Sequence, residues 1–116
     1  MSWVVGKIGY CNNEHLGIPF SGGHYVYIHS IDSDNKCTVS TITSLQNHDG
    51  SIKQERMFKL MKGYALSIPK LEDKSKLPLW SGINRNKISG VPVKFIHNIK
   101  DYIKSNYLDF YKSDEW

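Results

Sequence analysis

The sequence predicts a mainly β protein, in which short antiparallel strands form a small, strongly bent barrel closed by a C-terminal amphipathic helix. Three observations predict this fold. Gly, Pro, Asn and Asp interrupt short runs of β-branched and aromatic residues, two of these runs flank the turn sequence DSDN, and apolar residues near the C-terminus recur at three- and four-residue spacing. With 116 residues, 40% of them apolar, the chain is the size of one domain, and we expect a single domain over residues 1–116.

The N-terminal part predicts one strand and then a long loop. Residues 3–10, WVVGKIGY, are typical of a strand. Residues 11–23, CNNEHLGIPFSGG, contain turn formers and three glycines, and they are long for a hairpin connection. Because long loops often carry binding and catalytic residues, this loop is a candidate functional segment.

A β-hairpin is predicted next. Residues 24–31 form its first strand, with Tyr25 and Tyr27 on one face and Val26 and Ile28 on the other. Residues 32–35, DSDN, form the turn because Asp and Asn tolerate left-handed backbone angles and bond locally. The second strand follows over residues 36–43.

The remaining chain predicts two further strands and one helix. Residues 45–60 begin as a polar loop and regain apolar character, which fits either a strand or a helical turn. Residues 63–69 and 79–83 are strand-like and flank the charged loop 70–78. After Pro92, apolar residues at helical spacing predict an amphipathic helix lying across the sheet; they are Phe95, Ile96, Ile99, Tyr102, Ile103, Tyr107 and Phe110.

Composition narrows the function classes. A formal net charge of +4 favours an anionic partner such as nucleic acid. No apolar run approaches the roughly 20 residues that span a bilayer, and no signal peptide is visible, so we expect a cytoplasmic protein without a membrane partner. Without an export signal, Cys11 and Cys37 are expected to be reduced thiols. No metal-ligand spacing or nucleotide-binding motif is present, and no metal or other cofactor is expected.

The candidate catalytic residues are His24, Thr43 and Ser44. His24 follows Gly22 and Gly23, so its imidazole can face a cleft at the start of a strand and transfer protons near neutral pH. The hairpin brings Thr43 and Ser44 near the loop before His24, where hydroxyls can bind a phosphate. The alternatives stay open: His24 as a partly exposed strand residue bonded to a neighbour, and the hydroxyls as ordinary strand and turn residues.

The candidate substrate-binding residues are Gly22, Gly23, Tyr25 and Arg85. The glycines allow a ligand to approach the backbone, and aromatic rings such as that of Tyr25 offer flat surfaces for bases. Arg85 lies in the turn-like stretch INRNKISG, where its planar guanidinium could bind phosphate. Proteins that bind single-stranded RNA combine aromatic rings, on which bases stack, with cations that hold phosphates. Most of the aromatic residues of this chain must also fill the core.

Four stretches carry a resemblance to a known family: VVGKIGYC, SGGHYVYIHS, CTVSTITSL and KFIHNIKDYIKSNY. Their order resembles that of the PemK/MazF-like toxins of type II toxin–antitoxin systems. The resemblance implies an SH3-like barrel that cleaves single-stranded RNA without metal, acts as a homodimer and is neutralised by a cognate antitoxin protein. His24 stands where this family has its catalytic arginine, and Tyr25 where it has a proline.

The resemblance implies that the ribose 2′-hydroxyl attacks its own phosphate and leaves a cyclic phosphate and a 5′-hydroxyl. We therefore assign His24 to proton transfer, Thr43 or Ser44 to phosphate stabilisation, and Arg85 to phosphate binding. The alternative is a catalytically inactive barrel that binds a protein, as an immunity or antitoxin-like partner, or binds RNA without cleaving it. The missing arginine favours that alternative.

Overall fold

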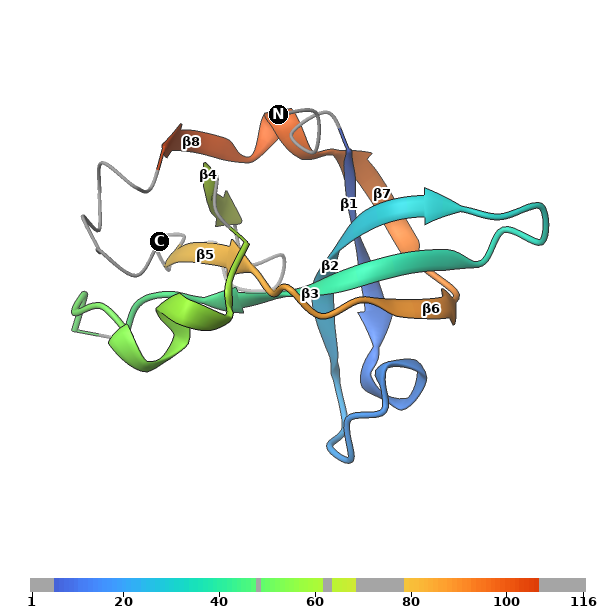
Figure 1. Ribbon diagram of the computed structural model, residues 1–116, viewed down its shortest axis with the longest axis horizontal. Coiled ribbons are helices and arrows are strands. Elements are labelled where there is room, and N and C mark those ends of the chain that lie inside the picture. The colour runs from blue at the N-terminus through green and yellow to red at the C-terminus, as the bar shows by residue number, and fades with distance from the viewer. Residues whose placement is uncertain (1–5, 48, 62–63, 69–78, 107–116) are drawn as a thin grey trace.

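The computed structural model describes residues 6–47, 49–61, 64–68 and 79–106. Its described part consists of strands joined by turns and short 3-10 helices (Figure 1). The strands are β1 (Lys7–Asn12), β2 (Gly23–Ile31), β3 (Cys37–Ser44), β4 (Tyr64–Ile68), β5 (Leu79–Ile83), β6 (Ile88–Val91), β7 (Lys94–Asn98) and β8 (Ile103–Asn106). The 3-10 helices are η2 (Asn13–Leu16), η3 (Gln54–Lys59) and η4 (Ile99–Asp101).

All eight strands belong to one curled antiparallel sheet, a half-barrel. The order across the sheet is β7-β1-β2-β3-β5-β4-β8, with β6 also paired to β3. The two strands at the ends of this order, β7 and β8, follow one another in the chain and are joined by η4 (Figure 1). The sheet must therefore curl until its two ends come within reach of that short connection. The mainly β prediction is confirmed.

Strand β3 lies between β2 on one edge and β5 and β6 on the other, and its pairing with β2 stops before the strand ends. Its first part pairs with β2, as far as the Val26–Thr41 pair. Its last three residues lie beyond this pairing and pair with β5 on the opposite edge, from Ile42–Ile83 to Ser44–Ser81. Meanwhile the start of β2 continues along β1, where His24 lies opposite Cys11. Strands β2 and β3 therefore diverge beyond Val26, as Figure 1 shows.

Strand β2 is buried on both faces because a separate apolar cluster packs on each side. Val26, Tyr27 and Ile28 are each 4% exposed or less. Tyr27 belongs to the cluster formed with Ile8, Ile42, Leu66, Ile68, Ile83 and Ile99. Val26 and Ile28 belong to the second cluster, with Cys11, Leu16, Cys37, Val39 and Val91. The predicted alternation of side chains is therefore present, but neither face of the central part of the strand is open to water.

The predicted hairpin is confirmed with small shifts at its ends. Its strands are Gly23–Ile31 and Cys37–Ser44. The Asp32 carboxylate accepts hydrogen bonds from the backbone N–H groups of Asp34 and Lys36, both at 2.9 Å. Asn35 adopts φ 60°, a left-handed angle that asparagine tolerates better than most residues. The turn chemistry of the sequence DSDN accounts for this register.

The predicted C-terminal helix is wrong for residues 94–106. This segment forms β7, η4 and β8, and residues 107–110 of the prediction lie outside the described part of the chain. β7 pairs with β1, and β8 pairs with β4. Without these pairs, β1 and β4 would each present unpaired backbone groups along one open edge. Pairing with β7 and β8 satisfies those groups. Phe95 and Ile96 are 62% and 40% exposed, so their helical spacing does not correspond to a buried stripe.

The other assignments have mixed outcomes. The strands predicted at 63–69 and 79–83 are confirmed as Tyr64–Ile68 and Leu79–Ile83. The first strand is displaced toward the C-terminus, to Lys7–Asn12, and residues 3–5 of the prediction are outside the described part, as is the loop 70–78. Segment 45–60 contains an isolated bridge, Gln46–Ile52, followed by η3. β6 was not predicted. None of the helices formed by the described residues could cross a bilayer.

Candidate functional site

The two glycines before His24 are required for different reasons. Gly22 adopts φ +103°, an angle that residues with a side chain rarely adopt. Gly23 has no such angle, but a Cβ there would lie 2.6 Å from the Tyr10 ring and 2.7 Å from the Cys11 carbonyl oxygen. Strand β1 therefore passes directly over Gly23. Together the glycines let the chain turn sharply and enter β2 against β1.

His24 is oriented by Asn13, which is only 4% exposed. The Asn13 Nδ2 group donates to the Ser21 carbonyl oxygen at 3.3 Å, and this bond turns its Oδ1 toward the imidazole. Oδ1 lies 2.6 Å from His24 Nδ1. A carboxamide oxygen can only accept, so Nδ1 carries the proton. In the neutral ring, Nε2 therefore has the lone pair that a general base needs.

A cavity of about 350 Å³ lies where β2 and β3 diverge. We call it the phosphate cavity, after the ligand that we propose for it below. Its lining comes from β2, β3, β4, β5 and the loop after β3; the residues are Gly23, His24, Tyr25, Ile42, Ser44, Gln46, Asn47, Lys53, Ile68 and Ser81. The structure therefore brings together four of the predicted site residues: His24, Ser44, Gly23 and Tyr25. Lys53 supplies a positive charge that the prediction did not include.

The Ser44 hydroxyl is engaged in a local turn. Its Oγ donates to the Gln46 carbonyl oxygen at 2.9 Å, and the Gln46 backbone N–H points back to the same Oγ at 3.4 Å. Because the single hydroxyl proton is already used, Ser44 is not arranged to donate to a phosphate in this geometry.

Thr43 lies outside the lining of the phosphate cavity. Its Oγ1 accepts a hydrogen bond from Nη1 of Arg56 on η3. The same Nη1 lies 3.4 Å from the Ser44 carbonyl oxygen. Adjacent residues of a strand point to opposite faces, which explains why Ser44 reaches the cavity and Thr43 does not. Thr43 therefore fastens η3 to the end of β3.

Arg85 also lies apart from the phosphate cavity. Its backbone N–H donates to the Lys59 carbonyl oxygen at 3.0 Å. Its Nε donates to the Leu60 carbonyl oxygen at 2.8 Å. These bonds hold the turn after β5 against the segment after η3. Gly22 lines a different cavity, described below.

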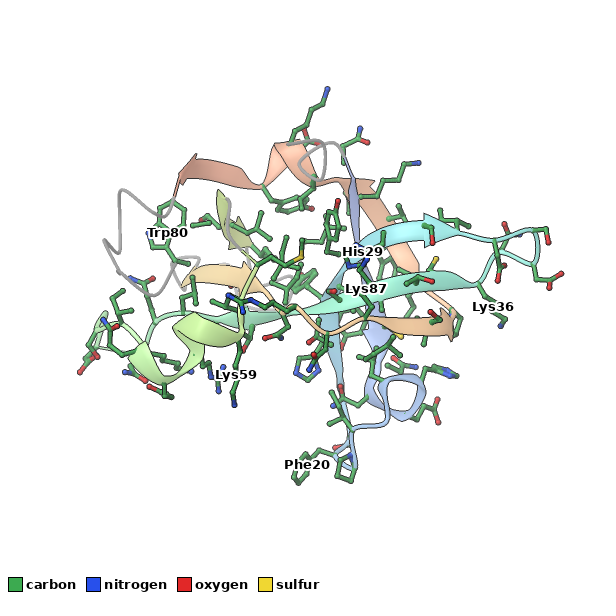
Figure 2. The ribbon with its side chains drawn as sticks, in the orientation of Figure 1. Phe20, His29, Lys36, Lys59, Trp80 and Lys87 are labelled. Atoms are coloured by element: carbon green, nitrogen blue, oxygen red, sulfur yellow. The ribbon has the colours of Figure 1, made fainter. Side chains whose placement is uncertain are left out.

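His29 contacts a hydroxyl group, but the direction of the hydrogen bond is the opposite of the one that would activate a nucleophile. Ser40, fully buried, donates to the Asn86 carbonyl oxygen at 2.8 Å. His29 Nε2 lies 2.7 Å from Ser40 Oγ and must therefore be the donor. Burial, and to a lesser extent the nearby charge of Lys87, lowers the pKa of His29. Figure 2 labels His29 and Lys87. The hydrogen bond between His29 and Ser40 links β2 to β3 and stabilises the sheet.

The described residues contain no group of three or more His, Cys, Asp or Glu side chains arranged to hold a metal ion. Cys11 and Cys37 are both buried and unpaired. Burial raises the pKa of each thiol, and each is raised further by a neighbouring group, Cys37 for Cys11 and Asp32 for Cys37. Neutral, buried thiols are poor nucleophiles, so neither cysteine is a candidate catalytic residue.

Sequence reasoning missed Asn13 and Lys53. Asn13 is 11 residues before His24, and no local spacing pairs a loop carboxamide with a strand histidine. Lys53 lies in a segment whose structure the sequence left open, so nothing placed it beside β2. Comparison with known proteins gives no further guide, since no protein-family model, no curated protein and no solved structure matches this chain. The resemblance to PemK/MazF-like toxins stays a prediction.

Proposed function

We propose that the protein is a metal-independent endoribonuclease that cleaves single-stranded RNA in the phosphate cavity. The contact between His24 Nδ1 and Asn13 Oδ1, 2.6 Å, carries this proposal because it leaves Nε2 as the proton acceptor of a residue that lines the cavity together with Lys53. The net charge of +4 favours a polyanionic substrate. The PemK/MazF-like resemblance supplies the reaction class.

The proposed step is an internal transesterification. His24 Nε2 removes the proton of the ribose 2′-hydroxyl, and O2′ attacks the adjacent phosphorus atom. The bond from phosphorus to O5′ breaks, and O5′ takes a proton from the imidazolium or from water. The products are a 2′,3′-cyclic phosphate and a 5′-hydroxyl. Lys53, which also lines the cavity, is assigned to stabilise the negative charge that develops on the phosphate oxygens.

The fold class, the localisation and the partners that we propose follow from the same resemblance. The half-barrel belongs to the SH3-like class in this proposal, and the protein acts as the cytoplasmic toxin of a toxin–antitoxin pair. A second copy of the chain and a cognate antitoxin protein are its partners. The curled sheet with long strands β2 and β3 supports the barrel class.

The test is incubation of single-stranded RNA with purified protein in EDTA, followed by mapping of the new ends. His24→Ala should lower the cleavage rate by about 100-fold or more, the scale of an acid–base residue. Lys53→Ala should also lower it. Lys36→Ala is the matched control, because Lys36 lies at the far tip of the β2–β3 hairpin (Figure 2). Cleavage that persists in His24→Ala, with the same end groups, overturns the proposal.

A second function is favoured by one observation. The Ser44 hydroxyl donates to the Gln46 carbonyl oxygen and Thr43 lies outside the cavity lining, so the proposed chemistry rests on the His24 imidazole and the Lys53 ammonium. A module that binds RNA without cutting it needs no more than that. Such a module predicts intact RNA and an affinity that falls steeply with salt. A protein-binding, antitoxin-like module predicts little affinity for RNA at physiological salt.

A further inference from the structure

A second cavity, of about 340 Å³, lies at the same glycine turn. We call it the base cavity. Its lining residues are Tyr10, Asn12, Glu14, Phe20, Ser21 and Gly22. Gly22 lines this cavity and Gly23 lines the phosphate cavity. Consecutive Cα atoms are about 3.8 Å apart, so the two cavities meet at one point of the backbone.

Phe20 is the most exposed large apolar side chain in the described residues, at 75%. It projects from the end of the loop between η2 and β2 (Figure 2). The loop that carries it is fastened at its base, because the Asn13 N–H donates to the Gly22 carbonyl oxygen at 2.9 Å and the Ile18 N–H to the Asn13 carbonyl oxygen at 3.1 Å. An exposed aromatic ring on an anchored loop is suited to stack on a planar ligand.

Tyr10 provides a second aromatic wall, and it is held in place. Its ring meets that of Tyr25 edge to face, with centroids 5.8 Å apart. The Lys94 ammonium lies 5.8 Å from the Tyr10 ring centroid. The base cavity therefore combines a fixed ring, an exposed ring and a nearby cation. This combination is typical of sites that bind the bases of single-stranded nucleic acid.

Glu14 determines which base fits. Its carboxylate only accepts hydrogen bonds, and its charge repels phosphate. Guanine presents two adjacent donors, N1–H and the N2 amino group, which match the two oxygens of a carboxylate. Adenine, cytosine and uracil each present a donor next to an acceptor on that edge. Glu14 is 75% exposed, and its Oε1 lies 3.5 Å from Nε2 of the half-exposed His15, so the carboxylate can turn toward a ligand.

We propose that the base cavity binds a guanine base of single-stranded RNA, stacked on Phe20 and bonded to the Glu14 carboxylate. The RNA part of this inference rests on the proposed function, which places the adjoining phosphate in the phosphate cavity. The guanine then belongs to a nucleotide next to the cleaved bond. Cleavage is expected to be preferred beside guanine.

The test is to titrate the intact protein with guanosine 5′-monophosphate and, separately, with adenosine 5′-monophosphate. Changes in the amide chemical shifts give the dissociation constant of each nucleotide. Guanosine 5′-monophosphate should bind more tightly. Phe20→Ala should weaken its binding by about 5- to 150-fold, the range for loss of one base–aromatic stack. Glu14→Gln should lower the preference for guanine over adenine by a similar factor. Ile31→Ala, which truncates an apolar side chain 46% exposed on the hairpin, is the control and should change neither value.

Equal binding of the two nucleotides, or unchanged binding in Phe20→Ala, overturns the inference. Because Phe20 and Glu14 are exposed, these variants are expected to fold. Guanine binding without RNA cleavage would sink the nuclease and leave the base site standing, while cleavage without guanine preference would do the reverse.

Discussion

Gly23→Ala tests the close approach of β1 to the glycine turn. The new Cβ would lie 2.6 Å from the Tyr10 ring and 2.7 Å from the Cys11 carbonyl oxygen. The ring can rotate away at small cost, but the carbonyl belongs to a paired strand, in which Cys11 lies opposite His24. The substitution therefore forces β1 and β2 apart at the site itself.

The expected loss in free energy of unfolding is about 2 kcal/mol. Overpacking of a tight contact costs about 1–3 kcal/mol. Against this, an alanine at an angle it can adopt stabilises by about 0.4–1 kcal/mol through the unfolded chain. A contact with rigid backbone belongs at the upper end of the overpacking range, and the difference is close to 2 kcal/mol. The urea midpoint should fall by about 1 M for a slope near 2 kcal/mol/M.

Urea unfolding followed by tryptophan fluorescence measures this change. Gly17→Ala is the control, because a Cβ there meets nothing within 4 Å and only its φ of +73° opposes the substitution; it should cost about 1 kcal/mol. When Tyr10 is already alanine, Gly23→Ala should cost less free energy of unfolding, because only the clash with the Cys11 carbonyl oxygen remains. A Gly23→Ala variant as stable as the parent would show that β1 does not cross the turn at this distance.

Three further predictions follow from the described contacts. Asn13→Ala removes the acceptor that orients His24 and should slow RNA cleavage at least tenfold, while costing about 1–3 kcal/mol in urea unfolding for two lost hydrogen bonds. Because the pKa of His29 is lowered from 6.5 in the folded protein, the unfolded state binds more protons, so stability should fall as the pH decreases below about 6.5; His29→Gln should lessen that fall. Cys11 and Cys37, both buried, should react with a thiol reagent far more slowly in the folded protein than in urea.

The sequence was sufficient to predict the parts of the fold that local chemistry determines. The hairpin follows from the Asp32 side chain and the left-handed Asn35, and both lie within the turn. The C-terminal segment could not be predicted in the same way. Its apolar spacing fits a helix, but without it one edge of β1 and one edge of β4 would be unpaired, and tertiary pairing with residues 94–106 satisfies those edges.

The candidate site was predictable only where local turn chemistry determines which residues lie close together. His24 and Ser44 lie near each other because one hairpin carries both, and hairpin register can be inferred from the turn. Which hydroxyl faces the cavity depends on where the pairing of β3 with β2 ends, and no local pattern marks that point. Asn13 lies in the short helix η2 and Lys53 in the irregular segment before η3. Neither segment has a periodicity from which the direction of a side chain could be predicted.

The most direct test of the central claim is one cleavage measurement. Single-stranded RNA containing guanines is incubated in EDTA with the parent protein and with His24→Ala, and the ends of any fragments are mapped. Cyclic phosphate and 5′-hydroxyl ends from the parent, reduced about 100-fold or more in the variant, are the predicted result. RNA left intact by the parent, or cut equally well by the variant, would contradict the assignment of His24 as the general base.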